Sequence, residues 1–376
     1  MDARDGNGRP SAAGGEGDLG RAFGRDPRGG RLGEGLGEDL RELYRFYLPE
    51  DLRERLDRMG RLRRWILAGW HLLRSLLLRL SPGRRLALVI ALATMLLGRL
   101  QFRYGGQIGF AVEFSFWGFL ILLVVLMLEL KDKLLARDEI AVARQVQLAL
   151  LPREHPRVSG WSVWSVTRPA NDVGGDLVDY VEVPGGVSLV LGDVAGKGLG
   201  AALLAAKLQA TVRAVAAESR SLAELGRRLN AVLHRDGIEN RYATLFLAEI
   251  APGSGDVRFL NAGHNPAIVV RCGGGERLGA SGAPLGMFGE ASYGEGLVVL
   301  GPGDLLVVYS DGLTEAAGEG EEEFGEARLA SAAASLHGLP AAEAGPRLLR
   351  TVEGFVGARR LRDDLSLVVA SRSRNG

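Results

Sequence analysis

The chain has 376 residues, 47% of them hydrophobic and 24% charged, which is ordinary globular composition and excludes a wholly disordered protein. Lys and Arg total 46 against 45 Asp and Glu, so the net charge of +1 argues against a dedicated nucleic-acid binder, and no nucleic-acid partner is expected. The single cysteine, Cys272, excludes an intrachain disulfide and a cysteine-rich zinc site.

The first part of the chain has two distinct compositions. Residues 1–37 are rich in Gly, Arg, Asp and Glu and poor in apolar residues, so they cannot bury enough surface to offset ordering entropy, and we expect a disordered tail. Residues 38–85 have helical spacing, and seven arginines without an acidic residue occur from Arg61 to Arg85. This pattern predicts a basic amphipathic helical region that contacts anionic membrane lipid, with a core-facing helix as the alternative.

Two strongly apolar runs follow within residues 86–130. The first, from Leu86 to Gly98, reaches the roughly 20 residues that cross a bilayer only if it extends through Phe102. The second, from Ile108 to Leu130, has one charged residue toward each end. We predict two transmembrane helices joined by a loop near Tyr104–Gln107, against a buried hairpin of a soluble domain. Basic residues flank the outer ends, which predicts a multi-pass protein of the cell membrane with a cytoplasmic C-terminal domain.

Residues 131–152 are expected to form a linker helix that ends at Pro152. A narrow apolar stripe on this helix consists of Leu135, Val142, Val146 and Ala149. The stripe is suited to a partner helix, so the linker could join two copies in a homodimer or transmit a signal. A linker packed on its own domain is the alternative, and both readings stay open.

From residue 153 to 376, short β-rich runs alternate with Gly, Pro and Asn clusters. Helical stretches are predicted between them, at Ala201–Ala217, Leu222–Leu233, Ala327–His337 and Ala341–Val356. Many consecutive strands with grouped helices predict an α+β layered fold with largely antiparallel sheets, because a parallel sheet would need a crossover helix after nearly every strand.

Acidic residues lie at the ends of several predicted strands, namely Asp176, Asp193, Asp311 and the pair Asp363–Asp364. An unpaired carboxylate at a core edge is costly, and hard oxygen ligands without His or Cys favour Mg²⁺ or Mn²⁺. Four aspartates balance two divalent ions, and two metals about 3.5–4 Å apart can hold a hydroxide for in-line attack on phosphorus. A lone strand-end Asp is more often a turn former, which is how we interpret Asp172.

A glycine-rich turn follows Asp193 in the run GDVAGKGLG. It lacks the spacing and the hydroxyl residue of a Walker phosphate loop, so a nucleotide site is not favoured. Its glycines still allow the backbone to approach an ion or a phosphate closely.

Eight segments, in this order, resemble the PPM-type metal-dependent Ser/Thr protein phosphatases, in their bacterial SpoIIE-like branch. They are ARQVQLALLP, VGGDLVDY, GDVAGKGLGAAL, YATLFLAEI, NAGHNPAIV, GAPLGM, DLLVVYSDGLTEA and DDLSLVV, and they extend from about Glu139 to Ser371. The resemblance implies a four-layer αββα sandwich, here preceded by a helical membrane hairpin, with two Mn²⁺ or Mg²⁺ ions at one end.

By motif match, the resemblance assigns the catalytic metal ligands to the side chains of Asp176, Asp193, Asp311 and Asp363 and to the carbonyl of Val194. Asp364 is the second choice for the last acidic ligand, and Asp179 is a candidate outer acid. The proton donor is unassigned, because Ala195 and Gly196 replace the His of the eukaryotic branch; metal-bound water is the default and His264 an alternative. Lys197 could approach the substrate phosphate or be a solvated turn residue.

The function that follows from the resemblance is a membrane-anchored serine/threonine phosphatase, a hydrolase that acts directly on phosphoserine or phosphothreonine. Relatives act on small phosphorylated regulators, such as antagonists of anti-sigma factors, so a phosphorylated regulatory protein is the expected partner. A catalytically inactive scaffold that binds a signalling partner is the alternative, and a hydrolase of nucleotides or lipid phosphates is a second one.

Overall fold

The computed structural model describes residues 80–104, 107–236, 241–318 and 320–374, together with isolated positions between 60 and 78. The expected disordered tail (1–37) and most of the expected basic region (38–85) lie outside the described residues. The chain divides into two compact units, Met1–Lys131 and Asp132–Gly376.

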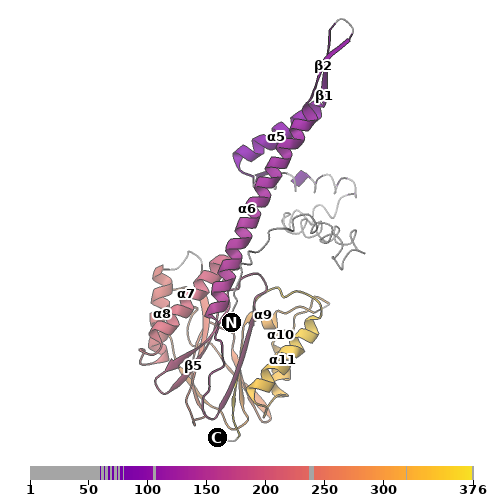
Figure 1. Cartoon of the computed structure of the whole chain (residues 1–376). Helices are drawn as coiled ribbons and strands as arrows, with labels where there is room; N and C mark the ends of the chain where they lie inside the picture. Colours follow the sequence, from indigo (N-terminus) through magenta and orange to yellow (C-terminus); the bar gives the residue numbers. More distant parts are fainter. Residues whose placement is uncertain are drawn as a thin grey trace, which may run out of the picture. The chain divides into compact units, whose positions relative to one another are not determined.

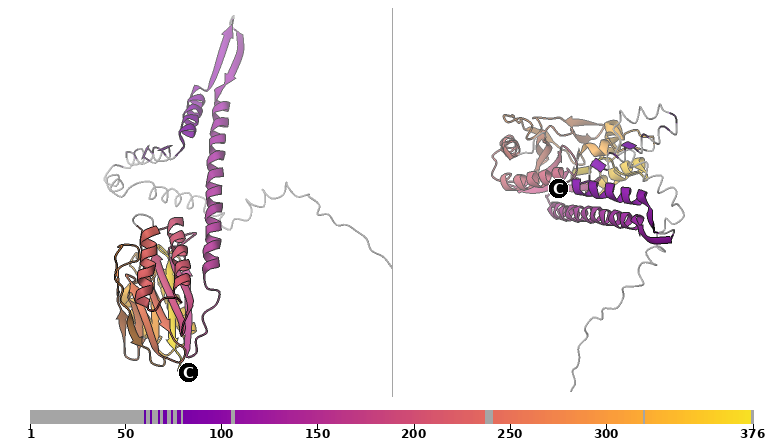
Figure 2. Two further views of the ribbon diagram at one scale, coloured as in Figure 1. Left: turned by 90° about the vertical axis from the view of Figure 1, so that its left-hand side faces the viewer. Right: turned by 90° about the horizontal axis from the view of Figure 1, so that it is seen from above.

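The first unit is built around two helices and a β-hairpin. Helix α5 (Pro82–Leu97) leads into strands β1 (Arg99–Tyr104) and β2 (Gln107–Glu113), and helix α6 (Phe114–Leu150) follows. The helices run antiparallel, since Gly118 packs against the Ala91 region while Arg84 pairs with Glu129 at 2.7 Å. A Cβ added to Gly118 would lie 2.6 Å from the Ala91 carbonyl oxygen, so glycine allows this close approach. Figure 2 shows α6 as one unbroken helix beside α5.

The two expected transmembrane helices are found only in part. Residues 99–113, expected to end one helix and begin the next, form an antiparallel hairpin with Arg99 opposite Glu113, so that part of the prediction is wrong. Alternation of polar and apolar residues in RLQFRY has the period of a strand and outweighs the apolar content. The 16 residues of α5 span about 24 Å, less than a bilayer core. Among the described helices, α6 alone is long and apolar enough to cross a membrane, so a multi-pass protein is not supported.

The second unit contains two five-stranded sheets in which every pair of neighbours is antiparallel. The first sheet has the order β10 (Gly296–Val299), β7 (Asp256–Ala262), β6 (Ala243–Ile250), β5 (Gly186–Val194), β4 (Leu177–Val183). The second has the order β3 (Trp161–Arg168), β12 (Leu365–Arg372), β11 (Leu305–Tyr309), β8 (Ala267–Arg271), β9 (Gly274–Leu278).

Helices cover the outer face of each sheet, as Figure 1 shows. Helices α7 (Leu199–Val215) and α8 (Leu222–Asp236) pack on the first sheet, and α10 (Gly325–Ala334) and α11 (Ala341–Val356) pack on the second. Strand β11 shows the resulting three apolar layers: Leu305, Val307 and Tyr309 face the helices, while Leu306 and Val308 face the other sheet. The predicted α+β fold with an αββα sandwich is confirmed.

The elements of this unit largely match the expectation. Helix α11 has the predicted bounds, and the predicted linker helix is the C-terminal part of α6. Two elements were not anticipated, β9 and the short helix α9 (Asp311–Thr314). The β9 sequence GGERL has neither β-branched residues nor alternation, so its pairing with β8 depends on tertiary context.

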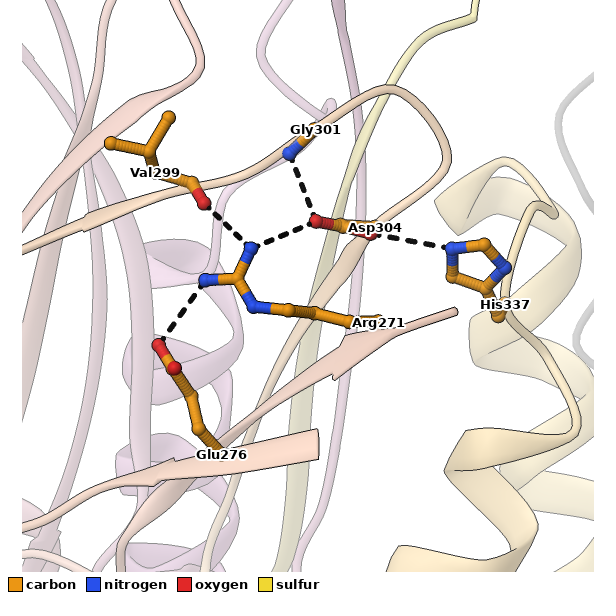
Figure 3. Close-up of polar contacts among 6 residues, drawn as sticks. All are labelled: Arg271, Glu276, Val299, Gly301, Asp304 and His337. Carbon is orange, nitrogen blue, oxygen red and sulfur yellow. Dashed lines mark hydrogen bonds and ion pairs between the residues drawn. The ribbon is translucent and has the colours of Figure 1, made fainter. Parts of the chain in front are cut away.

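A network of polar contacts around Asp304 lies at the end of the second sheet where β11 begins (Figure 3). Arg271 donates to Asp304 at 3.1 Å and to the Val299 carbonyl at 2.9 Å, and His337 contacts the other Asp304 oxygen at 3.3 Å. Asp304 precedes β11 and Asp311 follows it, so this network and Asp311 lie at opposite ends of that strand.

Two glycines of α11 provide a matched test of the packing between this helix and β3. A Cβ added to Gly345 would lie 2.0 Å from the Trp164 ring, whereas one at Gly354 would meet nothing within 4 Å. Gly345→Ala should therefore lower the free energy of unfolding by about 1–3 kcal/mol through overpacking. Gly354→Ala should raise it by about 0.5–1 kcal/mol through helix propensity. Thermal melting of the two variants checks this, and equal shifts would contradict the packing.

Candidate metal centre

In each sheet, neighbouring strands bring two predicted ligands to the same edge. Asp176 directly precedes β4 and Asp193 lies near the end of β5, where Leu177 pairs with Gly192. In the second sheet, Asp311 follows β11 and Asp363 precedes β12, where Tyr309 pairs with Leu367.

The two edges face each other across the sandwich. Asp311, Asp363 and Asp364 at the end of the second sheet are near enough to Asp193 of the first sheet for their charges to raise its pKa. The four predicted acidic ligands are therefore brought into one cluster, called here the carboxylate cluster (Asp176, Asp193, Asp311, Asp363).

Glycines permit the close approach of these strand ends. A Cβ added to Gly175 would lie 2.9 Å from the Val194 carbonyl oxygen and 3.4 Å from Asp193 Oδ1. One at Gly312 would lie 2.2 Å from the carbonyl oxygen of Asp364. The Val194 N–H donates to the Gly175 carbonyl at 3.3 Å, which fixes the predicted backbone ligand beside the turn before Asp176.

Burial and mutual repulsion make the cluster unfavourable as a set of bare anions. Burial, and then the neighbouring Asp193, raise the pKa of Asp176 well above its usual range. Burial and the charges of Asp311 and Asp363 raise the pKa of Asp193 to about 7. Burial, and then Asp363, also raise the pKa of Asp311. Divalent cations would relieve this repulsion, and oxygen-only ligands suit Mg²⁺ or Mn²⁺.

The side chains offer acidic oxygens of the kind that such a cation needs, but as they lie they do not form a ligand shell. Asp176 is 5% exposed, and its buried Oδ2 has no hydrogen-bond partner among the described residues. Within the same described part of the chain, no three His, Cys, Asp or Glu side chains are grouped closely enough to hold an ion as they lie. An unpaired buried carboxylate oxygen beside three other acids is nevertheless a place where a cation is favoured.

The two neighbouring acids of the last motif have different surroundings. Asp364 is 8% exposed, and its carboxylate accepts hydrogen bonds from Gly175 N at 2.6 Å and Ala170 N at 2.8 Å. Asp363 has a side chain that is 34% exposed and pairs with Lys197 at 2.7 Å. Asp364 thus fastens the turn that precedes Asp176 to the second sheet, while Asp363 has the more accessible carboxylate.

Three other residues considered from the sequence, Asp179, Lys197 and Asp172, lie outside the carboxylate cluster. Asp179, the candidate outer acid, accepts two hydrogen bonds from Arg213 at 2.6 and 2.9 Å, which occupy both of its oxygens. The Lys197 side chain is 58% exposed, and its ammonium pairs with Asp363 and donates to the Arg362 carbonyl at 3.0 Å, so as it lies it is engaged by protein groups. Asp172 lies in a bend and is exposed, as a turn residue would be.

His264 is buried and bonded rather than poised for proton transfer. Its ring Nδ1 lies 2.8 Å from the Thr244 hydroxyl, and its backbone N–H donates to Asn261 Oδ1 at 2.7 Å. Burial lowers the pKa of His264 to about 4, so the imidazole is neutral at pH 7 and lacks the imidazolium proton that a general acid would give to a leaving alkoxide.

Sequence reasoning missed a contact that holds the metal-ligand turn. The Gln147 side chain donates to the Gly174 carbonyl at 2.8 Å and accepts from the Gly174 N–H at 3.1 Å. Gln147 lies near the end of α6, whose Leu150 carbonyl accepts from Gln209 and Arg213 of α7. The motif ARQVQLALLP contains this glutamine, but spacing alone does not indicate a partner 27 residues away.

Comparisons with known proteins show which family the chain resembles. The family model described as Stage II sporulation protein E (SpoIIE) matches residues 184–373, half of the chain. Protein IcfG of Synechocystis sp. is 30% identical over 230 residues, which are 54% of this chain and 36% of that protein. Phosphoserine phosphatase RsbU of Bacillus subtilis is 25% identical over 181 residues, 48% of this chain and 54% of RsbU.

A solved structure has the same fold. The SiaA-PP2C domain of Pseudomonas aeruginosa superposes with a TM-score of 0.55 at 21% identity, over 64% of this chain and 98% of that domain. At this level of identity the likeness concerns the fold. The chain spans about a third to about half of the length of the two curated relatives, IcfG and RsbU.

The raised pKa of Asp193 predicts how the stability of the metal-free protein depends on pH. Its pKa is about 7 in the folded protein against 3.8 for an ordinary Asp, so between these values the folded state binds more protons than the unfolded state. The free energy of unfolding should therefore fall as the pH rises through this window.

The measurement is the melting temperature of the full chain in detergent with a chelator. It should decrease from about pH 5 to about pH 8 in the wild type and decrease less in Asp193→Asn. Mn²⁺ should restore the wild type at the higher pH. An identical pH slope in both proteins would contradict the role of Asp193.

Proposed function

Because the chain belongs to the SpoIIE family, we propose that it is a metal-dependent serine/threonine protein phosphatase whose phosphatase domain is residues 153–376. The resemblance noted from the motifs is confirmed by this membership. The observation that carries the proposal is the convergence of four aspartates from two separate sheets, with the pKa values of Asp176, Asp193 and Asp311 raised.

The proposed ligands of two Mn²⁺ or Mg²⁺ ions are the carboxylate cluster and the Val194 carbonyl. When bound, such ions polarise a phosphoryl oxygen and lower the pKa of water, which supplies a nucleophile at neutral pH. The chain itself positions the ligands: Asp364 and Gln147 hold the turn at Gly174 and Gly175 from two sides. Lys197 holds Asp363 through its ammonium group. We favour Asp363 over Asp364 as the metal ligand, because the Asp363 side chain is 34% exposed whereas the Asp364 carboxylate already accepts two backbone N–H groups.

The proposed substrate is phosphoserine or phosphothreonine on a regulatory protein. The name of RsbU, a phosphoserine phosphatase, supports this class, and an antagonist of an anti-sigma factor is the kind of partner that the resemblance implies. Retention of all four acids weighs against a catalytically inactive scaffold. A hydrolase of nucleotides or lipid phosphates would instead act faster on a nucleotide or on phosphatidate than on a phosphopeptide.

We also propose that α6 anchors the protein in the cell membrane through its apolar half, from Phe114 to Leu130, with lipid as the partner. Large apolar side chains there, such as Phe116, Trp117 and Leu126, are more than half exposed. Basic residues follow this segment, which supports a cytoplasmic phosphatase domain.

The next part of α6 supports a proposal of dimerisation. Leu135, Val142 and Val146 are each more than half exposed, so the predicted apolar stripe is uncovered in the single chain. A second copy of the linker helix would bury it.

Two neighbouring substitutions test the metal centre. Asp363→Asn should lower turnover of a phosphopeptide with Mn²⁺ by more than the ~10–100-fold typical of an outer-shell group, because it removes a ligand. The melting temperature should change little, since the pair of Asp363 with Lys197 is partly exposed. Asp364→Asn should lower both the turnover and the melting temperature, because the carboxylate of Asp364 accepts hydrogen bonds from two backbone N–H groups.

Chelation and Asp193→Asn serve as controls, and each should abolish turnover. Turnover that survives both would reject the metal mechanism. A stable, inactive Asp364→Asn beside an active Asp363→Asn would reverse the assignment of the two acids.

The lone cysteine tests the orientation in the membrane. Cys272 is exposed and follows β8 of the phosphatase domain. A membrane-impermeant maleimide should label it only after cells are permeabilised, and Cys272→Ser should remain unlabelled throughout. Labelling of intact cells would place the domain outside, and recovery of the protein in the soluble fraction would reject the anchor.

A further inference from the structure

Arg241 lies over the glycine-rich turn that follows Asp193. Arg241 lies two positions before Ala243, where β6 begins. Its guanidinium lies against Gly196 and Gly200. A Cβ added to Gly200 would be 2.9 Å from both Nη1 and Nη2, and one at Gly196 would be 3.6 Å from Nη1. Any larger residue at position 200 would displace the arginine, so glycine there leaves room for the guanidinium.

Among the described residues, no acidic side chain pairs with the guanidinium of Arg241. Its Nη1 is buried without a hydrogen-bond partner, and no ion pair reaches the group within the described part of the chain. An arginine is charged at every physiological pH, and a buried N–H donor without an acceptor is costly. Lys197 before α7 pairs with Asp363, and Lys207 and Arg213 on α7 pair with Asp236 and Asp179.

Backbone contacts connect Arg241 to the carboxylate cluster. Ala195, which follows the predicted ligand Val194, donates its N–H to the Tyr242 carbonyl at 2.9 Å. Strands β5 and β6 pair in the same region, with Val194 opposite Ala243. Arg241 therefore lies at the rim of the cluster, just before β6, the strand that pairs with the one carrying Asp193.

We propose that Arg241 and the turn Gly196–Gly200 form a site that binds an oxyanion of the substrate. The inference rests on the proposed phosphatase function. A guanidinium presents N–H groups in a fork that matches the oxygens of a phosphate or a carboxylate. The oxyanion is either the phosphoryl group itself or an acidic side chain beside the phosphorylated residue.

The surroundings of the turn suit a polypeptide. Leu199, the first residue of α7, is 41% exposed, and Tyr242 beside the arginine is 36% exposed. An uncovered leucine and tyrosine next to an unpaired arginine offer both apolar contact and charge to a protein segment.

The test compares Arg241→Ala with Arg227→Ala, which removes the same charge from an exposed position on α8. The full chain in detergent with Mg²⁺ is assayed on 4-nitrophenyl phosphate and on phosphopeptides with neutral or acidic flanks. The rise in melting temperature on adding inorganic phosphate gives a second reading that needs no turnover. If Arg241→Ala does not fold, Arg241→Lys keeps the charge but loses the fork and carries the same comparison.

An increase of about tenfold in KM for every substrate, together with a smaller phosphate-induced shift, would identify the phosphoryl group as the ligand. An increase confined to the acidic phosphopeptide would identify the flanking side chain. Arg241→Ala that matches Arg227→Ala in all assays would overturn the proposal. Absence of turnover in the wild type would reject the phosphatase function instead, and the phosphate-induced shift would still decide whether Arg241 binds an oxyanion.

Discussion

Repulsion among four carboxylates at one end of a β-sandwich is the constraint around which the phosphatase domain is organised. Strand pairing within each sheet brings two aspartates together, and stacking of the sheets brings the pairs face to face. The chain holds this arrangement with neutral backbone donors and close glycine contacts at Gly174, Gly175 and Gly312. The three apolar layers of the sandwich supply the stability that the cluster does not.

Two buried acids elsewhere in the domain have partners of opposite charge. Asp304 is paired with Arg271 at the far end of β11, and Asp179 is paired with Arg213 on the face of α7. Asp176, by contrast, has a buried oxygen without a partner in the described part of the chain. The difference indicates that the carboxylate cluster, in which Asp363 pairs with Lys197, is not balanced by ion pairs throughout. Its charge is left for a ligand that a protein side chain does not supply.

Periodicity predicted the sandwich well because both faces of each sheet are covered, so strands such as β11 are apolar throughout. It failed at residues 99–113, where the apolar content led us to expect helices although the alternation of polar and apolar residues is typical of the strands found there. It also failed at β9, whose sequence has little strand propensity of its own. The order of motifs predicted the four acids, since each lies beside a recognisable strand. The roles of Gln147, Arg213 and Asp364 depend on contacts between distant segments, which no local pattern encodes.

Charge balance explains why an unpaired arginine beside such a centre is informative. Four carboxylates offset two divalent ions in formal charge, so the loaded cluster would bring no net positive charge to an anionic substrate. Lys197 is already engaged by Asp363. The Arg241 guanidinium, with Nη1 buried and unpartnered among the described residues, is a cation next to the turn that follows Val194. Arg241 as a whole is only half-buried, so a phosphorylated substrate would pair with its charge while the phosphoryl group is held near the cluster. Binding and positioning would then depend on the same rim of the site.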